Sequence, residues 1–252
     1  MSSTHPFTPQ AGALLTPLLA LTGALWGALA GLLVPRAAYR LSVPPEESWR
    51  TESPEGAPLR SWVGLARAGG AWFGPRTWVV APAAALVCAA LAATTGPRPE
   101  LAVWLVLAPF GVLLAVVDFT VHRLPDVLTL PLGGAALVLL AVAALLPEHG
   151  GSWTGALYGA FALAGAYFVL FLISPDGMGF GDVKLALCLG AVLGWYGWGV
   201  LLLGAFAGFL LASLYGVALV VARRAGRRTA IPFGPFLISG AFMGVLLGAF
   251  SA

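Results

Sequence analysis

Apolar residues fill most of this chain in long blocks, and short polar stretches separate the blocks. A helix needs about 20 apolar residues to cross the hydrocarbon core of a bilayer. The pattern therefore predicts eight transmembrane helices, at about 12–34, 77–95, 101–117, 127–146, 152–173, 184–195, 198–222 and 232–250. The sixth block is short for a span, so we expect that helix to be tilted, kinked or partly buried.

The composition agrees with this reading. Of 252 residues, 60% are apolar and only 9% are charged, whereas a soluble domain carries about 25% charged residues. We therefore expect an all-α, polytopic membrane helical bundle in contact with lipid, built as a single membrane-embedded domain over residues 1–252. The net charge of +3 is small, and it favours membrane orientation over nucleic-acid binding.

The basic residues are distributed unequally between the two sides of the predicted bundle. Arg98 lies on one side, and the other twelve of the 13 Lys and Arg residues lie in or beside the connections 35–76, 118–126, 174–183 and 223–231. Positive charge accumulates in cytoplasmic loops, so we expect these connections in the cytoplasm and both termini outside. No Lys or Arg precedes the first block, which predicts an anchor rather than a cleaved signal peptide.

The connection 35–76 is the one long loop that the pattern predicts. Its first part, "SVPPEESWRTESPEGAP", is rich in Pro and Glu and is expected to be flexible. The following "LRSWVGLARAGGAWFG" is amphipathic and is expected to lie on the cytoplasmic membrane surface.

All four aspartates lie in two connections on this same side. Asp118 and Asp126 belong to "VVDFTVHRLPDVLTLP", and Asp176 and Asp182 belong to "SPDGMGFGDVK". Two carboxylates at close range share a proton because both cannot ionise easily. Such a pair can polarise a water and protonate a leaving group, as in aspartic proteolysis.

A metal site is the rival use of these carboxylates, since they also bind hard cations. Only His122 stands beside them, however, and no EF-hand spacing is present. The two cysteines, Cys88 and Cys188, lie inside apolar blocks and are expected to be small buried residues. Without a CxxC pair, the sequence indicates no cysteine zinc site.

Each charged residue also has a purely structural interpretation. Asp118 closes an apolar block and could be a solvated helix end, and Asp182 could cap the sixth helix. Asp126 follows a proline and is expected to be the N-cap of the fourth helix. Asp176 lies in a turn-like "SPDG". Lys184 could extend to the membrane surface, or its charge could tune the site.

"GMGFGDVK" resembles the GxGD motif of membrane-embedded aspartic proteases. Together with "VVDFTVHRLPDVLTLPL", it is similar to the type IV prepilin peptidase family, and "IPFGPFL" near the C-terminus also resembles a motif of that family. The resemblance implies that Asp118 and Asp182 are the catalytic pair. Asp126 is then a motif residue outside the pair.

The resemblance also implies a function. Members of this family are aspartic endopeptidases that remove a short basic leader from pilin, pseudopilin or Flp-type precursors, next to an apolar helix. The implied location is the inner membrane, with the active site facing the cytoplasm and no metal or organic cofactor in the chemistry.

The chain departs from the family pattern in its first cytoplasmic loop. Many members carry paired CxxC motifs there that are thought to bind zinc, and many also N-methylate the new N-terminus with S-adenosylmethionine. Residues 35–76 contain no cysteine, and apolar residues stand where the family's first motif has polar ones. The resemblance therefore supports the peptidase activity, and we assign no methyl-donor site.

Three other functions fit part of the pattern. Acids near a membrane often mark ion paths, so an ion-coupled transporter or channel is the main alternative. An inactive assembly factor and a different GxGD protease that cuts within the bilayer are the others. A cleavage assay with Asp182→Asn separates the peptidase from the transporter or channel and from the inactive assembly factor.

Overall fold

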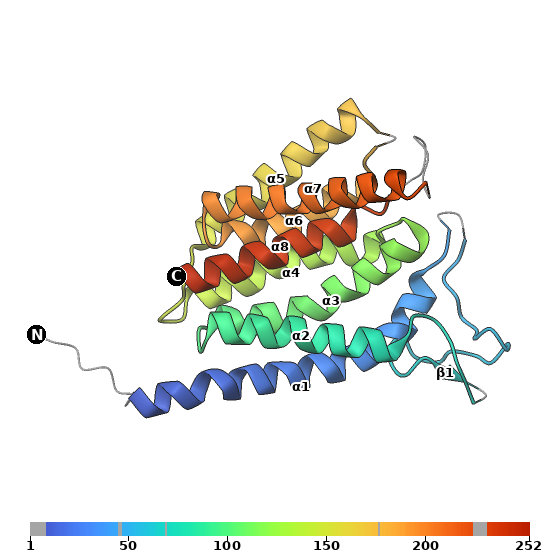
Figure 1. The fold of residues 1–252 in the computed structure, drawn as a ribbon, viewed down its shortest axis with the longest axis horizontal. Helices are drawn as coiled ribbons and strands as arrows, with labels where there is room; N and C mark the ends of the chain where they lie inside the picture. The colour runs from blue at the N-terminus through green and yellow to red at the C-terminus, as the bar shows by residue number, and fades with distance from the viewer. Residues whose placement is uncertain (1–8, 45–46, 69, 176, 224–230) are drawn as a thin grey trace, which may run out of the picture.

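The computed structural model describes residues 9–44, 47–68, 70–175, 177–223 and 231–252, and side chains from residue 14 onward (Figure 1). Nearly all of the secondary structure in these ranges is helical. The helices are α1 Pro9–Leu41, α2 Thr77–Thr95, α3 Glu100–Val121, α4 Asp126–Ala144, α5 Trp153–Ile173, α6 Phe180–Gly194, α7 Trp198–Val221 and α8 Gly234–Ser251.

Seven of these eight helices are long and apolar enough to cross a membrane, and α6 is not among them. The predicted all-α polytopic bundle is therefore confirmed. The two short strands, β1 (Arg67–Ala68) and β2 (Ala71–Trp72), form an antiparallel hairpin in the segment between α1 and α2.

The short helix α6 lies in the centre of the bundle, in contact with α4, α5, α7 and α8. It has only 15 residues, and its buried residues include every position from Cys188 to Gly194. The expectation that the sixth helix is partly buried is confirmed. Because lipid need not cover α6, the helix does not need the length of a full span.

Glycines allow three pairs of helices to approach closely, as small residues do in membrane proteins. A Cβ atom at Gly155 of α5 would lie 2.6 Å from the carbonyl oxygen of Gly194 of α6. The same kind of contact joins α1 to α2 and α7 to α8, through Gly23, Gly27, Gly31, Gly204, Gly208 and Gly240. These contacts hold α5 against α6, α1 against α2 and α7 against α8.

Several helices extend beyond the predicted apolar blocks. Helix α1 continues through Pro35 to Leu41, α3 continues to Val121, and α6 begins at Phe180. The last two extensions matter for function, because they place Asp118 and Asp182 inside helices rather than in loops.

Arginine side chains hold the segment between α1 and α2 against the end of α1. Arg40 is buried, and its Nη1 donates to the carbonyl oxygens of Leu59 and Ser61 at 3.0 and 3.1 Å. Arg36 donates to the carbonyl oxygen of Leu65 through Nε and Nη2. The part of this segment that the structure describes therefore packs on the bundle by hydrogen bonds from the helix.

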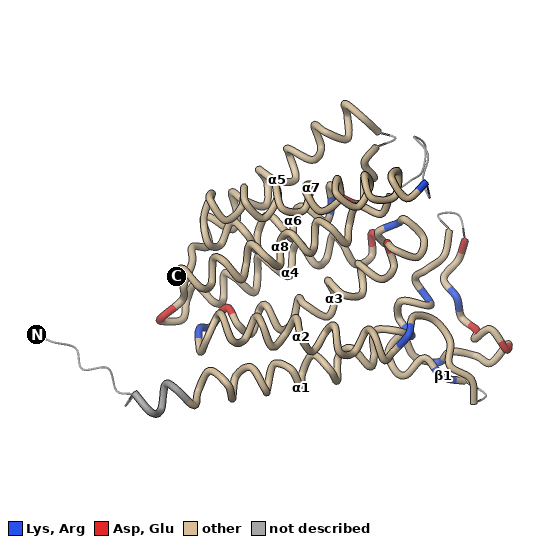
Figure 2. The backbone as a smooth tube through the Cα atoms, viewed as in Figure 1, with Lys and Arg blue, Asp and Glu red and all other residues tan. Residues whose placement is uncertain are grey.

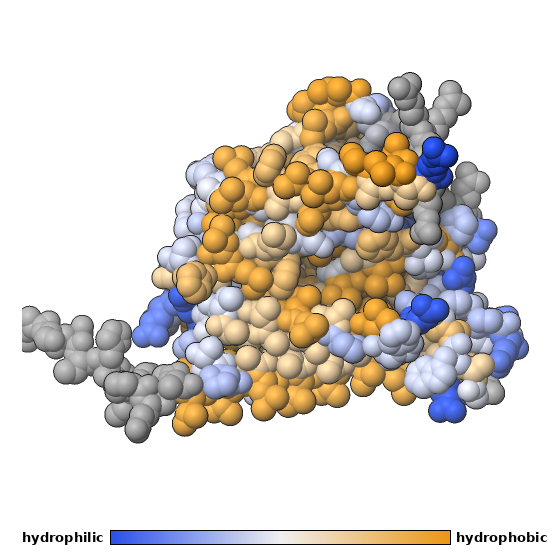
Figure 3. Space-filling model, in the orientation of Figure 1, coloured by the Kyte–Doolittle hydropathy of each residue, from blue (hydrophilic) through white to orange (hydrophobic). Residues whose placement is uncertain are grey.

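Charged and apolar residues are separated on the surface. Lys and Arg gather mainly at the end of the bundle that holds the β-hairpin (Figure 2). Apolar side chains cover most of the face between the two ends (Figure 3). This distribution agrees with the predicted sidedness of the basic residues, while the orientation of the termini stays a prediction.

Candidate functional site

Asp118 lies near the C-terminal end of α3 and is buried, with 4% of its surface exposed. Its Oδ2 accepts a hydrogen bond of 2.9 Å from the backbone N–H of Gly234, the first residue of α8. The N-terminus of a helix carries a partial positive charge, which stabilises a carboxylate. The interpretation of Asp118 as a solvated helix end is therefore wrong.

Asp182 is the third residue of α6's first turn and is also buried, with 6% exposed. Its Oδ2 accepts a hydrogen bond of 3.1 Å from the backbone N–H of Gly179. The aspartate thus bonds back to the residue that precedes the helix, as in one half of a capping box. The capping interpretation and a chemical role are compatible, because the second carboxylate oxygen stays available.

Leu124 connects the surroundings of the two aspartates. It is buried in the connection between α3 and α4. A Cβ atom at Gly181, next to Asp182, would lie 3.0 Å from Leu124 Cβ. A Cβ atom at Gly234, which bonds Asp118, would lie 3.3 Å from Leu124 Cδ2. The chain neighbour of Asp182 and the donor to Asp118 thus meet at one leucine, and the charge of Asp118 acts on Asp182. We call these two aspartates the carboxylate pair.

Burial and charge act together on the second member of the carboxylate pair. Asp182 lies outside the seven spans. Burial, and to a smaller extent the nearby charge of Asp118, raises its pKa to about 7, against the opposing effect of the hydrogen bond from Gly179. A carboxyl group of this kind keeps a proton near neutral pH, as a general acid must.

Asp126 and Lys184 form an ion pair close to the site. Lys184 Nζ lies 2.6 Å from Asp126 Oδ2. Asp126 is the first residue of α4, and its side chain makes no cap hydrogen bond at that helix, whose N-cap is Pro125. The predicted N-cap role of Asp126 is therefore wrong, and its partner is on α6.

The remaining polar residues of the two connections take other positions. His122 ends α3 in the left-handed conformation, at φ 53°, and its N–H donates to the carbonyl oxygen of Asp118. Arg123 Nη1 donates to the carbonyl oxygen of Pro44 at 3.1 Å. Asp176, for which we expect a turn, lies outside the described residues.

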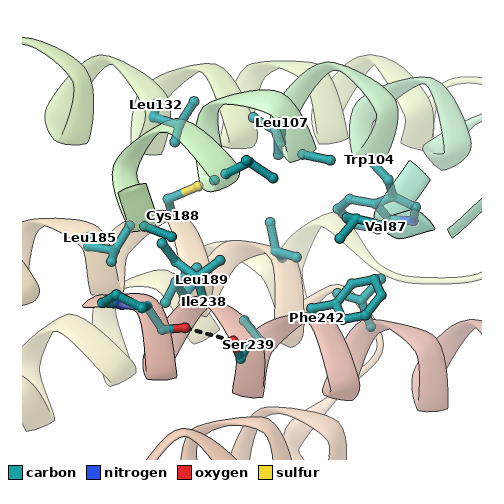
Figure 4. A pocket seen from close by; sticks show the side chains of 18 of the residues that line it. Val87, Trp104, Leu107, Leu132, Leu185, Cys188, Leu189, Ile238, Ser239 and Phe242 are labelled. Atoms are coloured by element: carbon teal, nitrogen blue, oxygen red, sulfur yellow. Dashed lines mark hydrogen bonds between the residues drawn. The ribbon is translucent and has the colours of Figure 1, made fainter. Parts of the chain in front are cut away.

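An apolar groove of about 350 Å³ lies between α2, α3, α6 and α8 (Figure 4). Leu185, Cys188 and Leu189 of α6 form its floor, and residues of α2, α3 and α8 form its walls. Its residues on α3 run from Trp104 to Phe119, which is about 22 Å along a helix. The lining also includes Phe119 and Pro235, which follow Asp118 and its donor Gly234 in the sequence, so one end of the groove is one residue along the chain from each.

Sequence reasoning missed this groove and the donor at Gly234. The groove depends on which faces of α3 and α8 meet, and that is a property of packing. The sequence feature that could have indicated the groove is a row of small residues at helical spacing in α3, namely Ala108, Gly111 and Ala115. The signal for Gly234 was the motif "IPFGPFL", which gave no indication of its contact with Asp118.

A metal ion has few available ligands in this protein. Among the described residues, no three His, Cys, Asp or Glu side chains are grouped in a way that could hold one. Residues 35–76 contain neither cysteine nor histidine, so the first loop does not fit the zinc site that the family resemblance implies. Cys88 and Cys188 are buried within α2 and α6.

Comparisons with known proteins agree with the resemblance. Residues 105–221 match the type IV leader peptidase family. The prepilin leader peptidase/N-methyltransferase of Aeromonas salmonicida (strain A449) is 32% identical over 218 residues, which cover 83% of this chain and 74% of the relative. The protein of the same description from Escherichia coli (strain K12) is 35% identical over 181 residues, or 69% of this chain and 74% of the relative.

No solved structure matches the chain. The match to the family spans both aspartates of the carboxylate pair, because it begins before Asp118 and ends after Asp182. With relatives above 30% identity over most of their length, the chain belongs to the type IV leader peptidase family, and it is a multi-pass membrane protein of that family.

Proposed function

We propose that this protein is an aspartic endopeptidase that removes the leader from prepilin-like precursors at the cytoplasmic face of the inner membrane. The precursors are pilins, pseudopilins or Flp-type pilins. The observation that carries the proposal is the carboxylate pair. Two buried aspartates on different helices each accept a hydrogen bond from a backbone N–H, and Leu124 lies against the donor to Asp118 and against the residue before Asp182.

The carboxylate pair suits general acid–base catalysis. Asp182, with a pKa of about 7, holds the shared proton, and Asp118 is the base. Asp118 takes a proton from water as the water oxygen attacks the scissile carbonyl carbon. Asp182 gives its proton to the amide nitrogen as the C–N bond breaks. The products are a leader with a new carboxyl end and a mature chain with a new amino end.

The groove supports an apolar helix as part of the substrate. It follows α3 for most of the depth of a bilayer and ends at Phe119, beside the carboxylate pair. Small residues in its α3 wall let a helix approach closely. A substrate helix in the groove would hold the scissile bond at the membrane surface, next to Asp118 and Asp182.

Cleavage of a precursor by the purified enzyme tests this proposal. A prepilin-like protein from the same genome is mixed with wild type, Asp118→Asn or Asp182→Asn, and the products are followed by gel shift and N-terminal mass. The exposed loop variant Glu55→Gln is the matched control for loss of one acid. We expect cleavage by wild type and by the control, and a loss of at least a thousandfold with either Asp→Asn variant.

Cleavage at the wild-type rate by either Asp→Asn variant would refute the catalytic assignment. Ion flux in proteoliposomes that is lost with Asp182→Asn, without any cleavage, would favour a transporter instead. The mass of the new N-terminus also tests the methyl-donor question. Because apolar residues, Leu32-Leu33-Val34 and Ala37-Ala38, stand where the family's first motif has polar ones, we expect an unmethylated N-terminus when S-adenosylmethionine is supplied, and a methylated one would contradict this.

A further inference from the structure

The ion pair between Asp126 and Lys184 joins the two chain segments that carry the carboxylate pair. Asp126 begins α4, directly after the connection that follows Asp118 and α3. Lys184 follows Asp182 by two residues on α6. At 2.6 Å, it is the one ion pair found within the described ranges.

A second contact holds the same two segments together. Leu124, two residues before Asp126, packs against Gly181, one residue before Asp182. The segments are therefore joined by an apolar contact and an ionic contact, a few residues from each catalytic carboxylate. Together these contacts hold the start of α4 against the start of α6.

The ion pair also determines where the charge of Lys184 lies. Residues two positions apart on a helix face different sides, and Asp182 bonds to Gly179 while Lys184 bonds to Asp126. The Lys184 ammonium also lies 4.8 Å from the centre of the Phe180 ring. Its side chain is only 17% exposed, whereas that of Asp126 is 63% exposed.

We propose that Asp126 and Lys184 form a positioning pair for the catalytic carboxylates, an inference that rests on the proposed function. The pair sets the distance between the two aspartates and keeps a cation away from their shared proton. Neither residue contacts the reacting atoms. Without Asp126, a half-buried ammonium near Asp182 would lack its partner and would attract the carboxylates instead.

Steady-state kinetics of precursor cleavage test this inference. The variants are Asp126→Asn, Lys184→Met, Lys184→Arg and the exchanged pair Asp126→Lys with Lys184→Asp. Small errors in the position of catalytic groups can cost about a hundredfold in rate. We expect the first two variants to lower kcat at least tenfold while KM changes less than about threefold.

Two variants should retain or restore activity. Lys184→Arg keeps the charge, and the exchanged pair keeps both charges and the combined length of the two side chains. Each should have a kcat within about fivefold of wild type. Arg123→Gln, which removes a cation from the same connection, is the control and should leave kcat unchanged. Melting temperatures in detergent should differ little, because partly exposed ion pairs contribute little to stability.

Three results would overturn the inference while leaving the proposed function intact. They are a wild-type kcat in both single variants, a low kcat that the exchanged pair does not restore, and a raised KM at an unchanged kcat, which would indicate substrate binding. Cleavage by Asp182→Asn would instead refute the proposed function, so the two failures are distinguishable.

Discussion

The nearest hydrogen-bond donor to Asp118 comes from a residue 116 positions away, the backbone N–H of Gly234. A Cβ atom at Gly234 would lie 2.9 Å from Asp118 Oδ2, so a side chain there would displace the carboxylate. Glycine at this position leaves the carboxylate free to accept the hydrogen bond. The contact at Gly181 is also tight, because a Cβ atom there would lie 3.0 Å from Leu124 Cβ.

The substitution Gly234→Ala should therefore lower kcat for cleavage about tenfold or more. The added methyl group would displace the Asp118 carboxylate or break its hydrogen bond, and hydrogen bonds to charged groups contribute about 1.5–3 kcal/mol. The rate of leader removal measures the effect. Gly134→Ala is the control, since a Cβ atom there meets nothing within 4 Å; equal activity of both variants would contradict the argument.

The protonation of Asp182 also predicts a pH-dependent stability. Its pKa of about 7 lies above the ordinary value of 3.8, so the folded protein binds this proton more tightly than the unfolded chain does. The stability from that proton is fully present below about pH 4 and is lost as the pH rises through about 7.

Asp182→Asn removes this dependence, because asparagine stays neutral. We expect the melting temperature of the variant to exceed that of wild type by several degrees at pH 8, where burial of the carboxylate charge destabilises wild type. At about pH 3.5, below the unfolded pKa of 3.8, the two should agree closely. Thermal unfolding in detergent at the two pH values measures the melting temperatures. The same difference between variant and wild type at both pH values would contradict the prediction.

At the scale of helices, the groove between α2, α3, α6 and α8 gives the most direct test of substrate binding. Gly111 lies in its α3 wall, and a Cβ atom there would meet only Ile238, at 3.5 Å. Gly111→Leu should therefore fill the groove without disturbing the bundle. We expect KM for the precursor to rise about tenfold, while kcat changes little because the carboxylate pair is untouched.

The control for this variant is Gly165→Leu on α5, where an added Cβ atom meets nothing within 4 Å. Precursor cleavage at a range of concentrations gives both constants. An unchanged KM in Gly111→Leu would mean that the substrate helix binds elsewhere on the bundle.

Apolar patterning predicted the number and order of the helices but not where each one ends. It locates the hydrocarbon core of a bilayer, whereas helical hydrogen bonding continues beyond that core wherever the backbone permits. This is why α3 extends past the predicted end to include Asp118, and why α6 begins before Asp182. The contacts of Leu124 and Gly234 join distant parts of the sequence, so no local pattern could reveal them.

At the scale of the whole molecule, the charge distribution connects the fold with its orientation. The basic residues gather mainly at the end of the bundle that carries the β-hairpin, as Figure 2 shows. Asp118 lies near the end of α3 and Asp182 lies in the first turn of α6, so the carboxylate pair is at helix ends rather than in the middle of the apolar face. By the positive-inside rule, this arrangement supports a site that faces the cytoplasm.

The position of Gly234 at the start of α8 has a consequence for biosynthesis. Helix α8 follows both aspartates in the sequence, and its first residue, Gly234, donates the backbone N–H that Asp118 accepts. A ribosome therefore synthesises Asp118 and Asp182 before it synthesises this donor. A nascent chain that has both aspartates but has not yet reached Gly234 lacks the hydrogen bond to Asp118.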